Sequence, residues 1–260
     1  SCSGHGHPAR TAVESGGAEV TVPGRAGSAD AGASDGGDVE GPDGADVALG
    51  RATWPEVDRR PPTLLAVPLG ATEQHGPHLP LDTDTRVAVA LAQRLAASRP
   101  DVVVAPALPF GSSGEHAGFA GTLSIGQAAL ETVVVELVRS ADAFAGVVLI
   151  TGHGGNAEPL NRAVTTLRAE GRGVLAWGPS VPGGDAHAGR TETSLLLALD
   201  PAAVRTDLAE AGATEPLADL LPRLRAGGVT AVSLNGVLGD PAGASAGEGR
   251  ALLATLTDDL

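Results

Sequence analysis

Short apolar runs alternate with segments of helical spacing along most of the chain from residue 63 onward. The apolar runs have the length of buried strands and are too short to be helices. They predict strands at Leu64–Leu69, Asp101–Ala105, Gly146–Ile150 and Gly173–Trp177. The segments after them predict helices over residues 85–98, 126–144 and 157–170, and a further helix that starts near Thr191. Strands that alternate with helices in this way predict an α/β fold with a parallel sheet covered on both faces.

The pattern is weaker at both ends of the chain. Residues 201–228 mix prolines with one predicted helix at 215–225, and Thr230–Leu234 predicts a last strand before a closing helix at 246–258. Residues 1–48 are rich in Gly, Ala, Ser and Asp and show no periodicity, so they predict a disordered acidic extension. The remaining residues, 49–260, are predicted to form one domain, with Trp54 packed where the chain enters it.

Composition and charge exclude several classes of function. The formal net charge is −14, so the chain has no general electrostatic reason to bind nucleic acid or an anionic membrane surface. The chain has no lysine, which excludes a lysine nucleophile or Schiff base. Its single cysteine indicates a reducing compartment, and we expect a cytoplasmic protein because neither a secretory leader nor an apolar run of about 20 residues is visible.

The histidines of the predicted domain all follow predicted strands. Because the carboxyl ends of parallel strands meet at one edge of a sheet, the side chains on these loops are predicted to converge. The five residues are His75, His78, His116, His153 and His187.

The loop after the first strand carries the densest set of candidate metal ligands. Glu73 and His75 are two residues apart, so in extended backbone they project to the same side. Asp84 follows just before a predicted helix, where the alternative role is that of a helix N-cap. Carboxylates and imidazoles together suit zinc, manganese or iron.

Three later loops add candidates, each with a structural alternative. The turn Thr151–Asn156 places His153 among glycines but lacks the lysine of a phosphate-binding loop, which favours a metal ligand, and Asn156 is expected to cap the next helix. Glu192 falls in the first turn of a helix, where the helix dipole favours a carboxylate in any case. Glu115 and His116 lie in a long glycine-rich loop and are candidates to contact substrate, to orient a ligand, or only to be solvated.

Four motifs together resemble the creatininase family of metal-dependent amidohydrolases. They are EQHGPHLPLDTD, GEHAGFAGTLS, GHGGN and HAGRTETS, in that order along the chain. The resemblance implies a three-layer α/β/α sandwich, two divalent metal ions per chain, and a homo-oligomer that is often a hexamer. It also implies a set of metal ligands: Glu73, His75, His153 and a bridging Asp84. Creatininase itself has an acidic ligand at the position of Gly155, and family members that lack it use the glutamate that matches Glu192.

Within the family, the likeness is greatest to a peptidase that releases the C-terminal dipeptide of a modified precursor peptide during cofactor biosynthesis. In such a site a water shared by two cations would attack the amide carbonyl. We expect His187 to give a proton to the departing amine, and His78 and Asp82 to orient ligands.

Three alternatives are less well supported. One is hydrolysis of creatinine or another small cyclic amide, which Gly155 disfavours. Another is a serine hydrolase, which lacks its G-x-S-x-G motif here. The last is a metal-binding scaffold without turnover, which would have no use for an acid such as His187.

Overall fold

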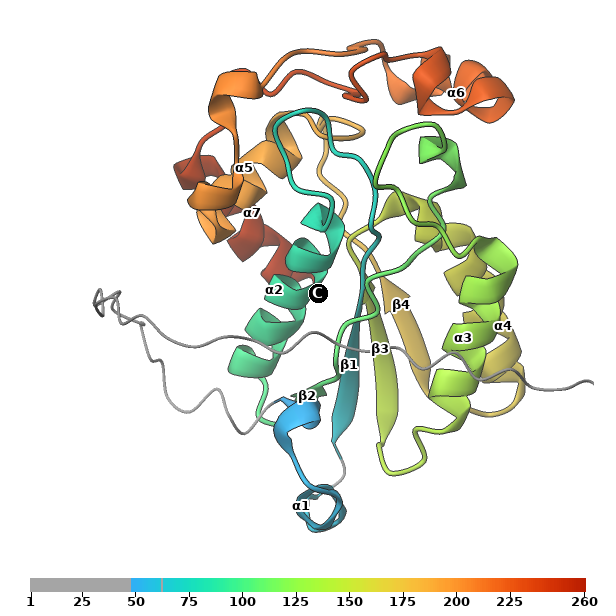
Figure 1. Ribbon diagram of the computed structural model, residues 1–260. Coiled ribbons are helices and arrows are strands. Elements are labelled where there is room, and N and C mark those ends of the chain that lie inside the picture. Colours follow the sequence, from blue (N-terminus) through green and yellow to red (C-terminus); the bar gives the residue numbers. More distant parts are fainter. Residues whose placement is uncertain (1–47, 62) are drawn as a thin grey trace, which may run out of the picture. The chain divides into compact units, whose positions relative to one another are not determined.

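A four-stranded parallel sheet forms the centre of the domain. The computed structural model describes residues 48–61 and 63–260, so the prediction of a disordered extension lies outside the described residues. The strands are β1 (Leu64–Leu69), β2 (Val102–Val104), β3 (Gly146–Thr151) and β4 (Val174–Trp177). They lie in the order β2-β1-β3-β4, and Leu64 of β1 pairs with both Val102 and Gly146 (Figure 1).

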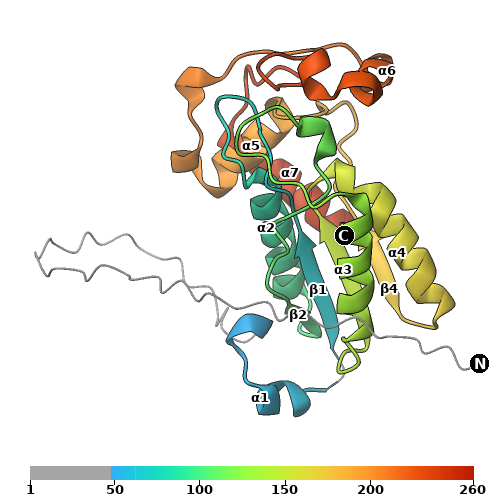
Figure 2. The same cartoon turned by 45° about the vertical axis from the view of Figure 1, so that its right-hand side comes forward.

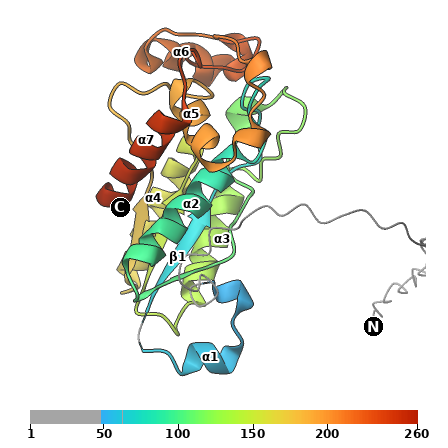
Figure 3. The same cartoon turned by 90° about the vertical axis from the view of Figure 1, so that its left-hand side faces the viewer.

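Three helices cover one face of the sheet. They are α2 (Thr83–Ser98), α5 (Arg190–Leu199) and α7 (Ala246–Asp259). Figure 3 shows α2 and α7 in front of the sheet from this side. Their apolar residues, such as Leu91, Leu196 and Leu253, form one buried cluster with Ala66 and Ile150 of the strands. Removing these side chains from water supplies about 25 cal/mol per Å² of apolar surface, which stabilises this layer.

Two helices cover the opposite face. They are α3 (Gln127–Arg139) and α4 (Ala157–Ala169), which lie side by side in Figures 1 and 2. Leu130 and Leu160 pack there against Val67 and Leu149, which alternate with the strand residues that face the other layer. The architecture is therefore the predicted three-layer α/β/α sandwich.

The remaining helices lie outside these layers. Helix α1 (Trp54–Asp58) precedes the sheet, and α6 (Leu217–Gly227) lies above the carboxyl ends of the strands. Leu220 of α6 packs with Val229 and Leu238 in a small separate cluster. Short 3-10 helices occupy Leu49–Arg51, Gly114–His116, Gly154–Asn156, Pro201–Ala203, Thr206–Leu208 and Val229–Ala231.

Three predictions about elements are wrong. Thr230–Leu234 forms no strand: it begins in a 3-10 turn after Gly228 at positive φ, and Val229 and Val232 pack against α6. Helix α3 ends at Arg139, because residues 141–145 turn back toward β3. Trp54 is 79% exposed and packs no entry, since α1 buries none of its residues.

The order of the strands creates a crevice where α/β sheets commonly bind ligands. The chain leaves β1 toward α2 on one face and leaves β3 toward α4 on the other, although β1 and β3 are neighbours. Loops that diverge from neighbouring strands leave space between them at the carboxyl edge. Among residues 48–61 and 63–260, no helix is both long and apolar enough to cross a membrane.

Candidate metal centre

A cluster of buried carboxylates and imidazoles fills the crevice between β1 and β3. Glu73, His75 and Asp84 come from the segment after β1, and His153 comes from the loop after β3. Each of these four residues is at most 6% exposed. Such burial is costly for charged groups unless opposite charge lies close to them.

Asp84 lies at the centre of the cluster. Its Oδ1 is 3.0 Å from His75 Nε2, and its Oδ2 is 3.4 Å from His153 Nδ1. Three groups of side chains place one ligand atom each within 4.8 Å of one another. These groups are Glu73–Asp84–His153, His75–Asp84–Glu192 and Glu73–His75–His187. Asp84 thus takes part in two of the three groups.

Hydrogen bonds to the backbone fix which ring nitrogen faces the cluster. His75 Nδ1 lies 3.1 Å from the Glu73 carbonyl, and His153 Nε2 lies 3.0 Å from the Ser112 carbonyl. A carbonyl accepts but cannot donate, so each of these nitrogens carries the proton. The other nitrogen of each ring points at the carboxylates, where it carries a second proton in the metal-free protein and would bind a cation once that proton is lost.

The cluster contains oxygens without partners. Among the described residues, Oε2 of Glu73 and Oδ2 of Asp84 have no hydrogen-bond partner, and Oε1 of Glu73 has only the ring nitrogens of His116 and His153 near it, each at 3.2 Å. A buried carboxylate oxygen without a donor is strongly unfavourable. Divalent cations would supply the missing partners, and the mixture of oxygen and nitrogen donors is one that zinc, manganese and iron accept.

The pKa values of the metal-free cluster are also set by buried negative charge that lacks positive partners. Burial favours the neutral imidazoles, yet the carboxylates outweigh it and raise the pKa of His75 and of His153 to about 10. Burial raises the pKa of Glu192 to about 7. Burial also opposes the charge of Glu73, but contact with His153 holds the pKa of that carboxyl below its usual range. Protons on His75 and His153 thus provide positive charge that cations would otherwise bring.

Glu192 reaches the cluster from the first turn of α5. Its Oε2 accepts a 2.5 Å hydrogen bond from the backbone N–H of Ala188 and lies 3.9 Å from His75 Nε2. Ala188 is the one non-glycine residue with positive φ among those described, at 51°, and its side chain is buried in the core. A strained backbone conformation thus directs the N–H group that holds this carboxylate.

Gly155 has no room for a side chain. A β-carbon at this position would overlap His153 Nε2, Glu115 Oε1 and the Ser112 carbonyl oxygen. The carboxylate of Glu115 occupies that space and lies 3.5 Å from His153 Nε2. No acidic ligand can therefore project from position 155 while Glu115 keeps this place.

The structure separates the remaining predicted site residues into two sets. His116 and His187 lie against the cluster: His116 Nε2 is 3.2 Å and His187 Nδ1 is 3.8 Å from Glu73 Oε1. His78 is buried one contact further out and bonds Thr193, the neighbour of Glu192, at 2.9 Å. Asp82 is outside the cluster, because its carboxylate pairs with Arg86 at 2.7 Å on the surface of α2.

Two buried amides were missed or misread from the sequence. Asn156 was expected to cap a helix, but its side chain accepts from Ser112 N and donates to the Gly70 carbonyl and to Thr151 Oγ1. It thereby ties three site loops together. Gln74 lies between Glu73 and His75 in the sequence and was not among the predicted site residues. Its amide contacts both His116 and His187.

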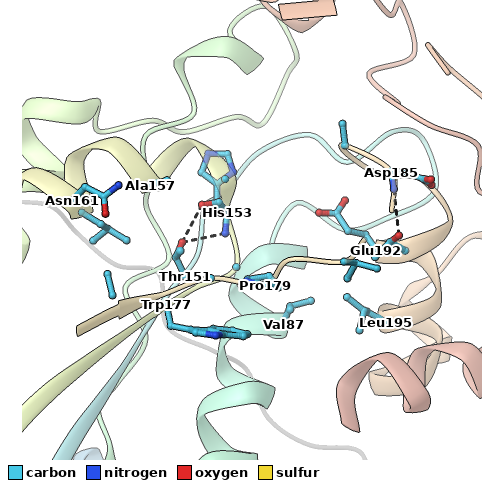
Figure 4. A pocket seen from close by; sticks show the side chains of 18 residues that line it. Val87, Thr151, His153, Ala157, Asn161, Trp177, Pro179, Asp185, Glu192 and Leu195 are labelled. Carbon is cyan, nitrogen blue, oxygen red and sulfur yellow. Dashed lines mark hydrogen bonds between the residues drawn. The ribbon is translucent and has the colours of Figure 1, made fainter. Parts of the chain in front are cut away.

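A cavity of about 400 Å³ opens beside the cluster at the ends of β3 and β4. His153 and Glu192 line it together with Leu195, and Figure 4 shows the Trp177 ring at one side of it, next to Val87. Its polar side chains include Asp185 and Asn161, and no arginine is among the described residues that line it. The cavity is large enough for a side chain of a substrate next to the cluster.

Comparison with known proteins matches this arrangement to one family. Residues 50–260 match the family model for creatininase, described as creatinine amidohydrolase. A Mycobacterium tuberculosis protein named mycofactocin precursor peptide peptidase is 52% identical over 222 residues, covering 81% of this chain and 88% of that protein. Creatinine amidohydrolase from Pseudomonas putida is 29% identical over 218 residues, covering 68% of this chain and 81% of that protein.

Solved creatininase structures have the same fold. The structure titled "Creatininase Mn" superposes with a TM-score of 0.68 at 28% identity, covering 82% of this chain and 95% of that one. A mutant creatininase of the "Zn-Zn type" gives the same TM-score at 27% identity, with 82% and 94% of the two chains covered. These structures are named for manganese and for zinc, and the mixture of oxygen and nitrogen donors found here suits both metals.

Proposed function

The chain belongs to the creatininase family of metal-dependent amidohydrolases, and on that premise we propose that it is a peptidase that releases the C-terminal dipeptide of the modified mycofactocin precursor peptide. It is a hydrolase of amide bonds, and relatives at 52% identity carry the name mycofactocin precursor peptide peptidase. The creatinine-hydrolysing relative is considerably less similar, at 29% identity. The peptide is therefore the better supported substrate.

The observation that carries the catalytic part of the proposal is that Asp84 belongs to two groups of potential metal ligands. One cation would be held by Glu73, Asp84 and His153, and a second by His75, Asp84 and Glu192, with Asp84 bridging. Bound cations of this kind supply an activated water at neutral pH and positive charge next to the carbonyl under attack. Zinc, iron and manganese all accept this set of ligands.

His187 is the residue proposed to handle the proton. Burial, together with the nearby His75 and His116, lowers its pKa, so the ring is neutral near pH 7. A neutral ring beside Glu73 is able to take a proton from the attacking water and deliver it to the departing amine. The cavity beside His153 and Glu192 would hold a substrate side chain while this happens.

Gly155 supports the peptidase over the creatinine alternative. Creatininase has its acidic ligand at this position, whereas here the backbone, His153 and Glu115 fill the space where a side chain would begin. Glu192 instead supplies the carboxylate from α5. A different carboxylate position changes the shape of the space next to the second cation, where a substrate must fit.

The test compares two substrates with one metal-loaded preparation of the full chain. Loaded with zinc or manganese and given the modified precursor peptide, it should release a C-terminal dipeptide detectable by mass spectrometry. The same preparation should leave creatinine unchanged. Turnover of creatinine alone would establish the small-amide alternative. Retention of metal without turnover of either substrate would establish the scaffold alternative.

A further inference from the structure

Gln74 is buried between the two histidines that lie against the cluster but are not among its proposed ligands. Its side chain is enclosed, with the residue only 5% exposed. The rings of His116 and His187 are 4.5 Å apart, and the Gln74 amide nitrogen lies 2.9 Å from His116 Nδ1 and 3.1 Å from His187 Nε2. The inference that follows rests on the proposed function.

Two backbone groups fix the orientation of the Gln74 amide. The N–H group of Gly76, which can only donate, lies 2.8 Å from Oε1. The carbonyl oxygen of Gly236, which can only accept, lies 3.0 Å from Nε2. The opposite orientation would set donor against donor and acceptor against acceptor, so the NH₂ group is the one that faces the histidines.

This orientation determines the tautomer of His116. An amide NH₂ donates and cannot accept, so the His116 Nδ1 that faces it at 2.9 Å carries no proton. The proton of the ring is therefore on Nε2, which faces Glu73 Oε1 at 3.2 Å. His116 presents an N–H group to the cluster and is not a metal ligand through that nitrogen.

The backbone of Gln74 determines the tautomer of His187 in the opposite sense. His187 Nε2 lies 2.8 Å from the Gln74 carbonyl oxygen, which can only accept, so this nitrogen carries the proton. The two hydrogens of the Gln74 NH₂ group go to Gly236 O and His116 Nδ1, so its 3.1 Å contact with His187 Nε2 is not a hydrogen bond. The remaining nitrogen, Nδ1, is bare and faces the cluster, 3.8 Å from Glu73 Oε1. The two neighbouring rings thus present opposite polarity: a donor from His116 and an acceptor from His187.

We infer that Gln74 is a positioning residue that sets this polarity. Its side chain directs the N–H group of His116 toward Glu73, and its carbonyl leaves His187 with the bare nitrogen that accepts the proton of the attacking water. Gly236 is also needed for this position of the Gln74 side chain. It adopts φ 81°, and a β-carbon there would collide with Oε1 of Gln74, so only glycine lets the amide keep its place.

The direct test reads the tautomers by ¹⁵N NMR of the zinc-loaded full chain, which needs no substrate. The wild-type spectrum should show bare Nδ1 on both rings. In Gln74→Met, His116 should lose this preference while His187 keeps it, because the backbone carbonyl remains. Gly236→Ala should reproduce the change at His116. A protonated His116 Nδ1 in the wild-type chain, or an unaltered His116 in both variants, would overturn the inference.

A kinetic cycle separates positioning from a merely structural role. Gln74→Met should keep its metal content and lower kcat by about 10- to 100-fold, as expected for a residue that orients a site neighbour. In a His116→Asn background the same change should cost less than about twofold, because the two act as one unit. Additive losses would contradict the inference. Gln93→Met, on the exposed side of α2, is the matched control and should change nothing. If no substrate is turned over, the NMR result still decides the matter.

Discussion

The chemistry of single side chains here depends on which of their atoms are already engaged. His75 and His153 use one nitrogen on backbone carbonyls and turn the other toward Asp84. Asp84 leaves Oδ2 without a hydrogen-bond donor among the described residues. The bridging role proposed for Asp84 is therefore open to a direct experiment.

Replacing Asp84 should empty the centre. Asp84→Ala removes an oxygen from each proposed cation, so bound metal should fall from about two per chain toward none. Asp82→Ala is the matched control, since that carboxylate pairs with Arg86 on the surface, and it should keep its metal. Metal analysis by mass spectrometry gives the answer. If Asp84→Ala retained both metals, Asp84 would not be a metal ligand and would act only at the first turn of α2.

Glu192 and His187 share one motif and should fail in different ways. Glu192→Gln should lose one metal and most activity, and excess metal should restore part of it. His187→Ala should keep both metals and lose about 10²–10⁴ in rate, the usual contribution of a positioned acid or base. Excess metal should not restore that loss. A full metal complement in Glu192→Gln, or a missing metal in His187→Ala, would reverse the assignment.

The sequence indicated most residues of the cluster but not the hydrogen bonds that connect them. Glu73, His75, Asp84 and His153 were candidates because each follows a predicted strand or precedes a predicted helix, and the resemblance to the creatininase family implied them as the set of metal ligands. Gln74 could not be predicted by alternation, because the backbone stops being a regular strand after Leu69. Side chains in such loops point where tertiary contacts direct them.

At the scale of elements, the position of Glu192 depends on how closely α5 packs on α7. Gly249 of α7 is buried against the Ser194 carbonyl and Ala198 of α5. Ser194 Oγ also donates to Glu248 and accepts from Ser245 N, which fastens the same contact. The helix that presents a proposed ligand is thus held in place by the C-terminal helix.

Gly249→Ala should separate these helices. Alanine normally stabilises a helix by about 1 kcal/mol over glycine, but here its methyl group would collide with Ser194, and overpacking should cost about 1–3 kcal/mol net. A β-carbon at Gly247 of the same helix meets only an ordinary contact, 3.9 Å from Ser245 Oγ, so Gly247→Ala should stabilise the protein instead. Urea unfolding of both variants measures the difference. Equal effects would mean that α5 and α7 adjust without strain.

Elements with strong periodicity were predicted, and those shaped by a turn were not. All four strands of the sheet lie where the apolar runs placed them. The expected strand at Thr230–Leu234 has apolar residues of the right type, but it pairs with none of the four strands of the described sheet, and Gly228 starts a turn there instead. An apolar run cannot reveal whether a pairing partner is within reach.

At the scale of the whole domain, the centre links folding to metal and to pH. In the metal-free protein, the folded-state pKa of His75 and His153 is about 10, against 6.5 for an ordinary histidine. A raised pKa contributes stability that is fully present below pH 6.5 and is lost as the pH rises through 10. Metal replaces these protons with fixed positive charge.

Metal-free protein should therefore lose stability between pH 6.5 and 10. Zinc-loaded protein should lose less over that range, because ligands hold their metal better once deprotonated. Thermal unfolding at several pH values, with and without a chelator, measures both curves. Parallel curves would show that the two histidines keep ordinary pKa values.

A chain that begins at Leu49 should retain fold and activity. Leu49 packs against the core on the α3–α4 side of the sheet, so this truncation keeps that contact. Its melting temperature should stay within a few degrees of the full chain. A chain that begins at Pro61 removes Leu49 and α1 and should melt lower. If the chain that begins at Leu49 lost turnover, the residues before Leu49 would be required for activity.

The crowding at Gly155 also constrains how this enzyme could evolve. A mutation that placed an acidic residue there would collide with His153 and Glu115 before it offered a ligand, so the first step back toward a creatininase-type arrangement would be harmful by itself. Glu115 would have to change beforehand, a step with no evident advantage alone. The backbone at Ser112 and the side chains of His153 and Glu115 thus separate the two ligand arrangements within a shared fold, and chains that use Glu192 are expected to keep it.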